Sequence, residues 1–146
     1  MKKKSERLSV LVKIEEANER AEARKFSEYR KAVQDKKNKL TDLQGYLDEY
    51  RDKFLELSLH GIEADKIRSC YAFISQLNAA IAQQQKAVQD AEHAAEDYRR
   101  VWSQAKQRMD ILEKTISNIR KEELRHENKK EQLLADDLAR YKQHDH

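Results

Sequence analysis

The sequence predicts an all-α protein, a long two-helix antiparallel coiled-coil hairpin. Its 146 residues include no Pro and only two Gly, and 39% are charged, a composition that favours long helices and lacks the turn signals of a globular domain. Apolar residues recur at alternating steps of three and four in two long stretches, and Gly61 lies between them. We therefore expect a single unit over 1–146, with helix 1 at about 4–58, a turn at about 59–64 and helix 2 at about 65–142.

The first helix is predicted from a seam in which only Lys36 is polar. The second glycine, Gly45, falls outside this seam, so we expect it to cost about 1 kcal/mol without ending the helix. The seam positions are Phe26, Tyr29, Val33, Lys36, Leu40, Leu43, Leu47, Tyr50, Phe54 and Leu57.

The turn is predicted from the residues around Gly61. Glycine adopts the left-handed conformation that closes a helix, and His60 suits the negative end of the helix dipole. Glu63 and Asp65 suit the positive end of the next helix, and the sequence leaves the N-cap between these two.

The second helix carries sixteen seam positions, of which fifteen are apolar or aromatic. The exception, Gln84, is interpreted as a residue that fixes register rather than one that binds a ligand. Cys70 is interpreted as a buried, inert thiol opposite Phe54. The positions are Ile67, Cys70, Ile74, Leu77, Ile81, Gln84, Val88, Ala91, Ala95, Tyr98, Trp102, Ala105, Met109, Leu112, Ile116 and Ile119.

The pairing of the two seams follows from the short turn. Opposed residues should have numbers that add to 124, from Leu57 with Ile67, through Leu47 with Leu77, to Tyr29 with Ala95 and Phe26 with Tyr98. Beyond Phe26 this rule would set Glu22, Glu19 and Glu15 against apolar residues. A slip of one residue restores apolar partners, so we expect a local irregularity such as a single-turn bulge between Ala21 and Phe26. The slipped pairs are Ala21 with Trp102, Asn18 with Ala105, Ile14 with Met109, and Leu11 with Leu112.

The end of helix 2 should extend past the start of helix 1 by about 20 residues. Its apolar residues, Leu134, Leu138 and Tyr141, would have no partner within the chain. We expect an intermolecular partner to cover them.

Enzymatic chemistry is not predicted. The chain has no Gly-rich phosphate loop and no nucleophile elbow, and its five His are scattered, with His144 and His146 in a polar tail. We therefore predict no catalytic residues, no cofactor and no metal site.

The charge distribution and the lengths of the apolar runs limit the possible location and partners of the protein. The net charge is +3, and the first forty residues hold 13 Lys/Arg against 7 Asp/Glu. This excess of basic side chains either forms a solvated helix face or binds an acidic partner surface. Nucleic-acid binding is a weak third hypothesis, because the helices alternate charge sign, and we predict no nucleic-acid partner. No run approaches the ~20 apolar residues of a membrane span, the N-terminal run is too short for a signal peptide, and the single Cys fits a reducing compartment. These features predict a cytoplasmic protein without direct membrane insertion.

One edge of the predicted hairpin carries aromatic residues just outside the seam. The edge positions are Lys39, Tyr46 and Lys53 from helix 1, and Lys66, Phe73, Ala80 and Ala87 from helix 2. Tyr46 and Phe73 either broaden the packing stripe or form a binding edge near the turn, and the residues alone leave both interpretations open.

The segments "LQGYLDEYRDKF" and "HGIEADKIRSCYAFISQLNAAI" resemble the FliJ family of bacterial flagellar type III export. The motif residues fall within residues 40–81, while the predicted architecture matches over the whole length. They are Leu43, Tyr46, Tyr50 and Arg51, then Gly61 and Ile62, then Tyr71, Phe73, Ile74 and Leu77.

The resemblance implies a partner-binding face. FliJ proteins are antiparallel coiled coils similar to the central stalk of rotary ATPases; they insert their terminal end into the hexameric export ATPase, contact the export gate and handle export chaperones. Lys39 and Gln84 depart from the family pattern. Carried over by position, the gate-contacting residues are Lys39, Leu43, Tyr46, Tyr50, Phe73, Leu77, Ala80 and Gln84.

The resulting prediction is a non-enzymatic stalk of the flagellar export apparatus. It would bind the ATPase ring through its terminal end and the cytoplasmic domain of the export-gate membrane protein through the edge near the turn, peripherally at the inner membrane. Two alternatives are the equivalent stalk of a virulence type III secretion system and a generic homo-oligomerising coiled-coil scaffold.

Overall fold

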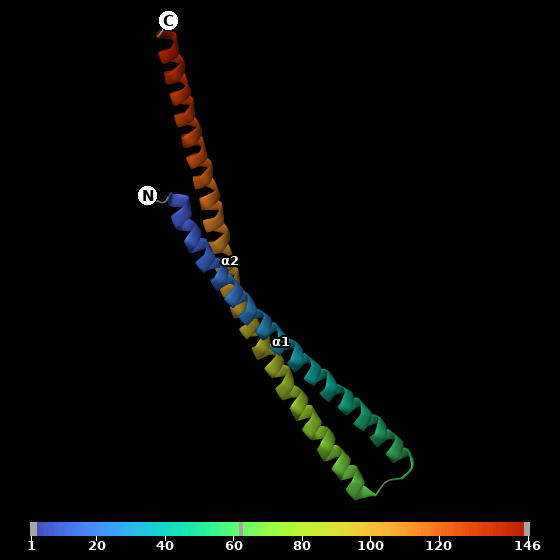
Figure 1. The fold of residues 1–146 in the computed structure, drawn as a ribbon. Coiled ribbons are helices and arrows are strands. Elements are labelled where there is room, and N and C mark those ends of the chain that lie inside the picture. The colour runs from blue at the N-terminus through green and yellow to red at the C-terminus, as the bar shows by residue number, and fades with distance from the viewer. Residues whose placement is uncertain (1–2, 62, 145–146) are drawn as a thin grey trace. The chain divides into compact units, whose positions relative to one another are not determined.

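The computed structural model describes residues 3–61 and 63–144 and contains two helices, α1 (Lys4–Leu59) and α2 (Ala64–His144), with no strand in these ranges. The chain reverses direction after α1, so α2 runs back along it (Figure 1). The predicted all-α coiled-coil hairpin is confirmed. Ile62 of the motif and His146 of the predicted polar tail lie outside the described residues.

The turn has the predicted chemistry at Gly61. Its φ of 74° lies in the left-handed region that glycine tolerates, and the amide of His60 donates to the carbonyl of Leu57 at 3.1 Å as α1 closes. The carbonyl of Glu63 accepts the amides of Lys66 and Ile67, so Glu63 holds the N-cap position of α2. Asp65 then lies in the first turn, where the helix dipole favours a carboxylate.

Contacts within the hairpin divide the chain into two units, which we call the closed unit (22–102, containing the turn) and the open unit (1–21 and 103–146). The closed unit is built around Leu47, Leu77 and Ile81, each at most 9% exposed. The pairing rule places these residues at neighbouring levels, and the structure packs them into one cluster. Partly buried Leu40, Leu43, Tyr50 and Ile74 surround it.

Aromatic rings extend the closed unit toward its other end. Tyr29 stacks on Tyr98 with ring centroids 4.1 Å apart, and Phe26 stacks on Trp102 at 5.8 Å. These ring contacts fall one helical turn beyond the predicted partners, Ala95 and Tyr98. The reason is that long side chains lean toward the N-terminus of their own helix, which carries the rings of α1 further along α2.

The open unit contradicts the predicted slip of register. Leu11 and Ile14, expected to face α2, are 47% and 58% exposed, and Asn18 and Ala21 are exposed as well. The face of α1 that packs on α2 is instead the unslipped one, and Ala105 and Ile116 are the buried residues of α2. The half-buried or buried residues of this face include Ser5, Leu8, Val12, Glu15 and Glu19.

The predicted bulge between Ala21 and Phe26 is also wrong, because α1 is α-helical throughout Lys4–Leu59. The unslipped register places Glu15 in the helix interface, where its side chain stays 30% exposed and its Oε2 lies 3.9 Å from Arg108. This Oε2 is buried without a hydrogen-bond partner, so the charge of Arg108 is its nearest compensation. A regular helix therefore persists, and the apolar residues of the slipped register point outward.

Candidate partner-binding surfaces

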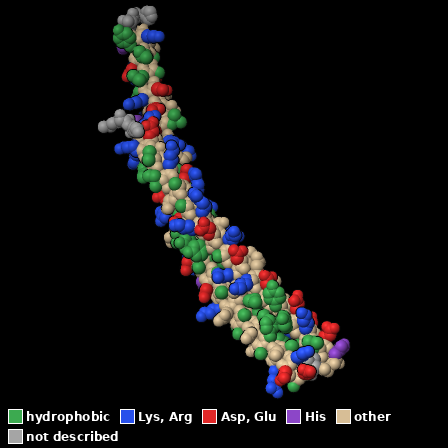
Figure 2. All heavy atoms as spheres, turned by 60° about the horizontal axis from the view of Figure 1, so that its bottom comes forward, with side chains coloured by type: hydrophobic (Ala, Val, Ile, Leu, Met, Phe, Trp, Pro, Cys, Tyr) green, Lys and Arg blue, Asp and Glu red, His purple; other side chains and the backbone are tan. Residues whose placement is uncertain are grey.

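The eight predicted gate-contacting residues all lie in the closed unit, and the structure separates them by exposure. Lys39, Tyr46 and Phe73 are exposed; Tyr46 is 53% and Phe73 38% exposed. Leu43, Tyr50 and Ala80 are half-buried, whereas Leu77 and Gln84 are buried at 8% each. Figure 2 shows hydrophobic side chains on the surface toward the end that carries the turn.

The two edge aromatics have different surroundings. Phe73 contacts the Tyr50 ring with centroids 4.2 Å apart and planes tilted by 35°, and Lys53 places its Nζ 5.6 Å from the same Tyr50 ring. Phe73 is therefore held against the seam by one face while part of it remains exposed. Tyr46 has more than half of its surface in solvent, so less of its ring contributes to the hairpin's own packing.

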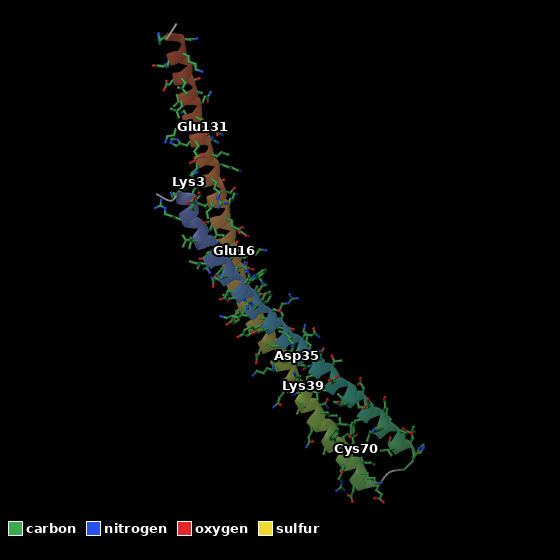
Figure 3. The ribbon with its side chains drawn as sticks, in the orientation of Figure 1. Lys3, Glu16, Asp35, Lys39, Cys70 and Glu131 are labelled. Atoms are coloured by element: carbon green, nitrogen blue, oxygen red, sulfur yellow. The ribbon has the colours of Figure 1, made fainter. Side chains whose placement is uncertain are left out.

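Gln84 has a structural role inside the seam. Its Nε2 donates to the main-chain carbonyl of Lys36 at 3.0 Å, so a buried side chain of α2 is tied to one particular residue of α1. This agrees with its interpretation as a register-fixing residue and leaves its amide without a free surface for a partner. Cys70, labelled in Figure 3 near the start of α2, is half-buried.

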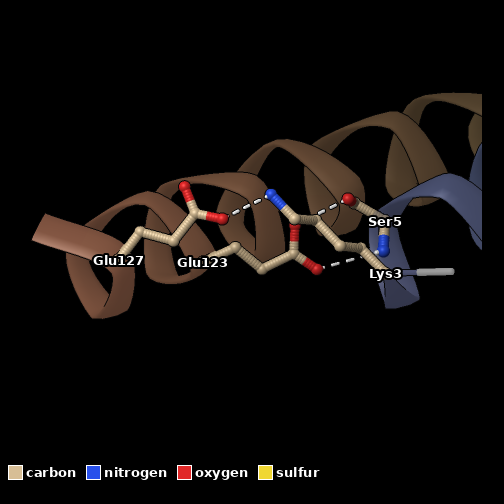
Figure 4. A network of polar contacts seen from close by, with 4 residues as sticks. All are labelled: Lys3, Ser5, Glu123 and Glu127. Carbon is tan, nitrogen blue, oxygen red and sulfur yellow. Dashed lines mark hydrogen bonds and ion pairs between the residues drawn. The ribbon is translucent and has the colours of Figure 1, made fainter. Parts of the chain in front are cut away.

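In the open unit, the start of α1 is hydrogen-bonded to α2. The carboxylate of Glu123 accepts the Ser5 hydroxyl at 2.7 Å and the Ser5 amide at 3.3 Å (Figure 4). The Ser5 amide is one of the first-turn donors that have no partner within their own helix, so α2 supplies a cap for α1. These hydrogen bonds lower the pKa of Glu123 despite partial desolvation of its carboxylate.

A second contact lies beside it. Lys3 Nζ donates to Glu127 Oε1 at 2.6 Å, and this hydrogen bond and the negative charge of Glu127 raise the pKa of Lys3. Both side chains are about half exposed, so water screens the pair. Together the two contacts fix where α1 begins along α2.

Beyond Glu127, α2 continues to His144 as a stretch that we call the overhang (128–144), and Figure 3 labels Glu131 within it. Every residue of the overhang is exposed. The apolar stripe that the sequence singled out stands in solvent, with Leu134 and Leu138 at 62% and Tyr141 at 69% exposed. These residues have the exposure that an intermolecular contact requires.

The structure also reveals an exposed apolar surface that includes Ile14 and Ala21, two residues that the slipped register places in the interior. We call it the outer stripe: Val10, Ile14, Ala17 and Ala21 of α1, all exposed. Its spacing of four, three and four is itself a second helical stripe, and this signal is readable from the sequence. Tyr71, 62% exposed while its ring packs edge-on to Phe54, is a further aromatic outside the predicted set.

Two kinds of feature are absent from the part of the chain that the structure describes. Among residues 3–61 and 63–144, no group of three His, Cys, Asp or Glu side chains could hold a metal ion. Within the same ranges, neither helix contains a stretch with the length and apolar character needed to cross a membrane.

The fold defines a helical-hairpin protein with exposed apolar and aromatic side chains on both helices. A family model described as "Flagellar FliJ protein" matches residues 3–145, and the chain belongs to this family. It is accordingly a non-enzymatic component of the flagellar export apparatus, and its family takes part in flagellum biogenesis and protein export. Neither a curated protein nor a solved structure matches the chain.

Proposed function

We propose that the hairpin is a coupling stalk that links two other components of the export apparatus. The open unit would bind the hexameric export ATPase, and the edge near the turn would bind the cytoplasmic domain of the export-gate membrane protein. Export chaperones would be further partners, and the protein would work peripherally at the inner membrane. Membership of a flagellar family favours this system over the equivalent stalk of a virulence secretion system.

The observation that carries the ATPase contact is the overhang. Its 17 residues, 128–144, are helical yet fully outside the two-helix packing, and they carry Leu134, Leu138 and Tyr141 in solvent. An isolated helix of this length is marginal in water, and a continuous apolar stripe lowers its free energy by packing against a partner.

The observation that supports the gate contact is the exposure of Tyr46 and Phe73 on the predicted edge. Aromatic side chains supply large contact area and are enriched among residues that dominate binding energy. Of the eight predicted residues, Lys39, Tyr46 and Phe73 are the most exposed, and Leu43, Tyr50 and Ala80 would contribute partial contacts. Leu77 and Gln84 would act by holding this edge in place.

The experiment is a pair of binding titrations with the full chain, one against the export ATPase and one against the gate's cytoplasmic domain. The proposal requires overhang substitutions to weaken the first interaction alone and edge substitutions to weaken the second alone. A chain whose overhang and edge variants bind both components like the parent would contradict it.

A further inference from the structure

The open unit leaves two apolar stripes uncovered, the outer stripe of α1 and the stripe Leu134, Leu138 and Tyr141 of the overhang. Within the described part of the chain, neither has a partner. They cannot cover each other in one molecule, because Glu15 lies beside Arg108 and the overhang begins twenty residues further along α2. At 1.5 Å per residue that separation is about 30 Å.

The outer stripe lies on the side of α1 that is turned away from α2. Successive residues of a helix rotate by about 100°, which places Val10, Ile14 and Ala17 roughly 160° around α1 from Leu8, Val12 and Glu15. The latter three are half-buried against α2, whereas Val10 and Ile14 are 56% and 58% exposed. A helix laid on the outer stripe would thus sandwich α1 between itself and α2.

We propose that two copies of the free protein pair through their open units, each laying its overhang along the outer stripe of the other. The apolar spacings agree, since four and then three residues separate the members of both stripes. The pairing stacks Val10 with Leu134, Ile14 with Leu138, and Ala17 with Tyr141. A large ring then meets a small side chain in the last layer, as interdigitated packing needs.

The direction of the helices fits this exchange. When two open ends face each other about a two-fold axis, the overhang of one copy runs the same way as α1 of the other, so the pairing is parallel. The Ser5–Glu123 contact sets the levels within each copy. Leu134 lies eleven residues beyond Glu123, and Val10 lies five residues beyond Ser5. When Leu134 of one copy is level with Val10 of the other, the difference between these two offsets separates the two Ser5 residues by about 9 Å along the helix axis. The two α1 helices therefore meet end to end without overlapping.

The charges fit at the first layer and oppose pairing at one edge. Arg7 precedes Val10 by three residues as Glu131 precedes Leu134, so an exposed cation meets an exposed carboxylate across the pairing. Lys13 would face Lys142 at the flank, because flanking residues of parallel helices meet about five positions apart. The symmetric exchange forms each contact twice, which helps a short apolar stripe to reach the area of a specific interface.

The direct test is disulfide trapping between differently labelled chains. Ile14→Cys and Leu138→Cys are each placed in a Cys70→Ser background and mixed under mild oxidation. The expected product is a mixed dimer that contains one chain of each kind. The matched control is Gln132→Cys, which lies on the opposite face of the overhang and should give several-fold less product with the Ile14→Cys chain. Equal yields with both cysteines, or no mixed dimer, would overturn the inference.

Sedimentation velocity on the full chain supplies a readout that needs no cysteine. Leu138→Asp should weaken dimerisation by about tenfold or more, since it places a charge in the central apolar layer. Lys142→Glu should strengthen it by about two- to fivefold, because it converts the Lys13 repulsion into an attraction. A monomer at every concentration up to the millimolar range, or no response to Lys142→Glu, would contradict the pairing. Neither readout uses the ATPase, so failure here leaves the proposed ATPase contact standing.

Discussion

The amide of Gln84 reaches from α2 to the main-chain carbonyl of Lys36 on α1, with 3.0 Å between the nitrogen and the oxygen. Gln84 is only 8% exposed, so this hydrogen bond lies within a mainly apolar seam. Apolar side chains alone tolerate sliding of one helix past another by a heptad, whereas this bond is made in one alignment only. The pair therefore specifies the register that also sets the edge near the turn.

Gln84→Ala should lower the free energy of unfolding by about 1–2 kcal/mol, because it removes a partly buried hydrogen bond and its packing. Gln83→Ala is the matched control, since Gln83 is an exposed neighbour and its loss should matter by less than about 0.5 kcal/mol. Urea unfolding followed by circular dichroism measures both. Equal effects of the two substitutions would show that the bond to Lys36 has no energetic role.

Glu15→Leu should raise the free energy of unfolding, by about 1 kcal/mol, because a half-buried carboxylate is replaced by apolar surface at the helix interface. Ile14→Glu should change it by less than about 0.5 kcal/mol, since Ile14 is 58% exposed. The slipped register requires the reverse ranking, with Ile14 sensitive and Glu15 indifferent. Thermal melts at concentrations where the chain is monomeric distinguish the two arrangements.

Acid should loosen the first turn of α1. Because the folded-state pKa of Glu123 lies below its ordinary value, its contact with Ser5 stabilises the open unit fully above the ordinary carboxyl pKa. That stabilisation disappears as the pH falls through the lowered pKa of the folded state. Amide hydrogen exchange at Ser5 should therefore show protection that falls in acid relative to the rest of α1. Glu123→Gln should remove this pH dependence. The control is Glu122→Gln, a substitution at the exposed neighbouring residue, which should leave the pH dependence in place. The same pH dependence in both variants would refute the role of Glu123.

Tyr46→Ala and Phe73→Ala should reduce affinity for the gate domain more than they reduce stability. Loss of an aromatic residue central to an interface costs about 2 kcal/mol or more of binding free energy. Leu47→Ala and Ile81→Ala should instead lower the free energy of unfolding by about 2–5 kcal/mol, because both lie in the closed unit's core. A melting curve beside a titration for all four variants separates the effects. If the two edge variants melt early yet bind normally when folded, Tyr46 and Phe73 are packing residues.

The sequence was a reliable guide wherever one apolar seam was unambiguous. The step of three and four residues predicted that Leu47, Leu77 and Ile81 come together, and Gly61 predicted the turn, because only glycine there closes a helix without strain. The interpretation of Gln84 followed from its being the one polar residue in the seam of helix 2. In each case periodicity and backbone chemistry pointed to one arrangement.

The open unit was mispredicted because it contains two apolar stripes and the stronger one faces outward. The sequence reasoning assumed that Leu11 and Ile14 must be buried and Glu15 exposed. In the structure Glu15 stays 30% exposed and lies beside Arg108, whereas a bulge would break the regular hydrogen bonds of α1. The Ser5–Glu123 cap was beyond prediction, since it depends on the level at which α1 begins.

The central claim is that the overhang couples this chain to the export ATPase, and turnover of that ATPase with overhang variants of the full chain tests it most directly. The double substitution Leu134→Ser with Leu138→Ser removes both leucines of the apolar stripe, and Gln132→Ser with Gln143→Ser alters the opposite face of the same helix. Circular dichroism should show that both variants remain helical hairpins, because neither pair contributes to the buried core. We predict that the parent and the glutamine variant stimulate turnover equally and that the leucine variant does not. Stimulation by the leucine variant at the level of the parent would contradict the account.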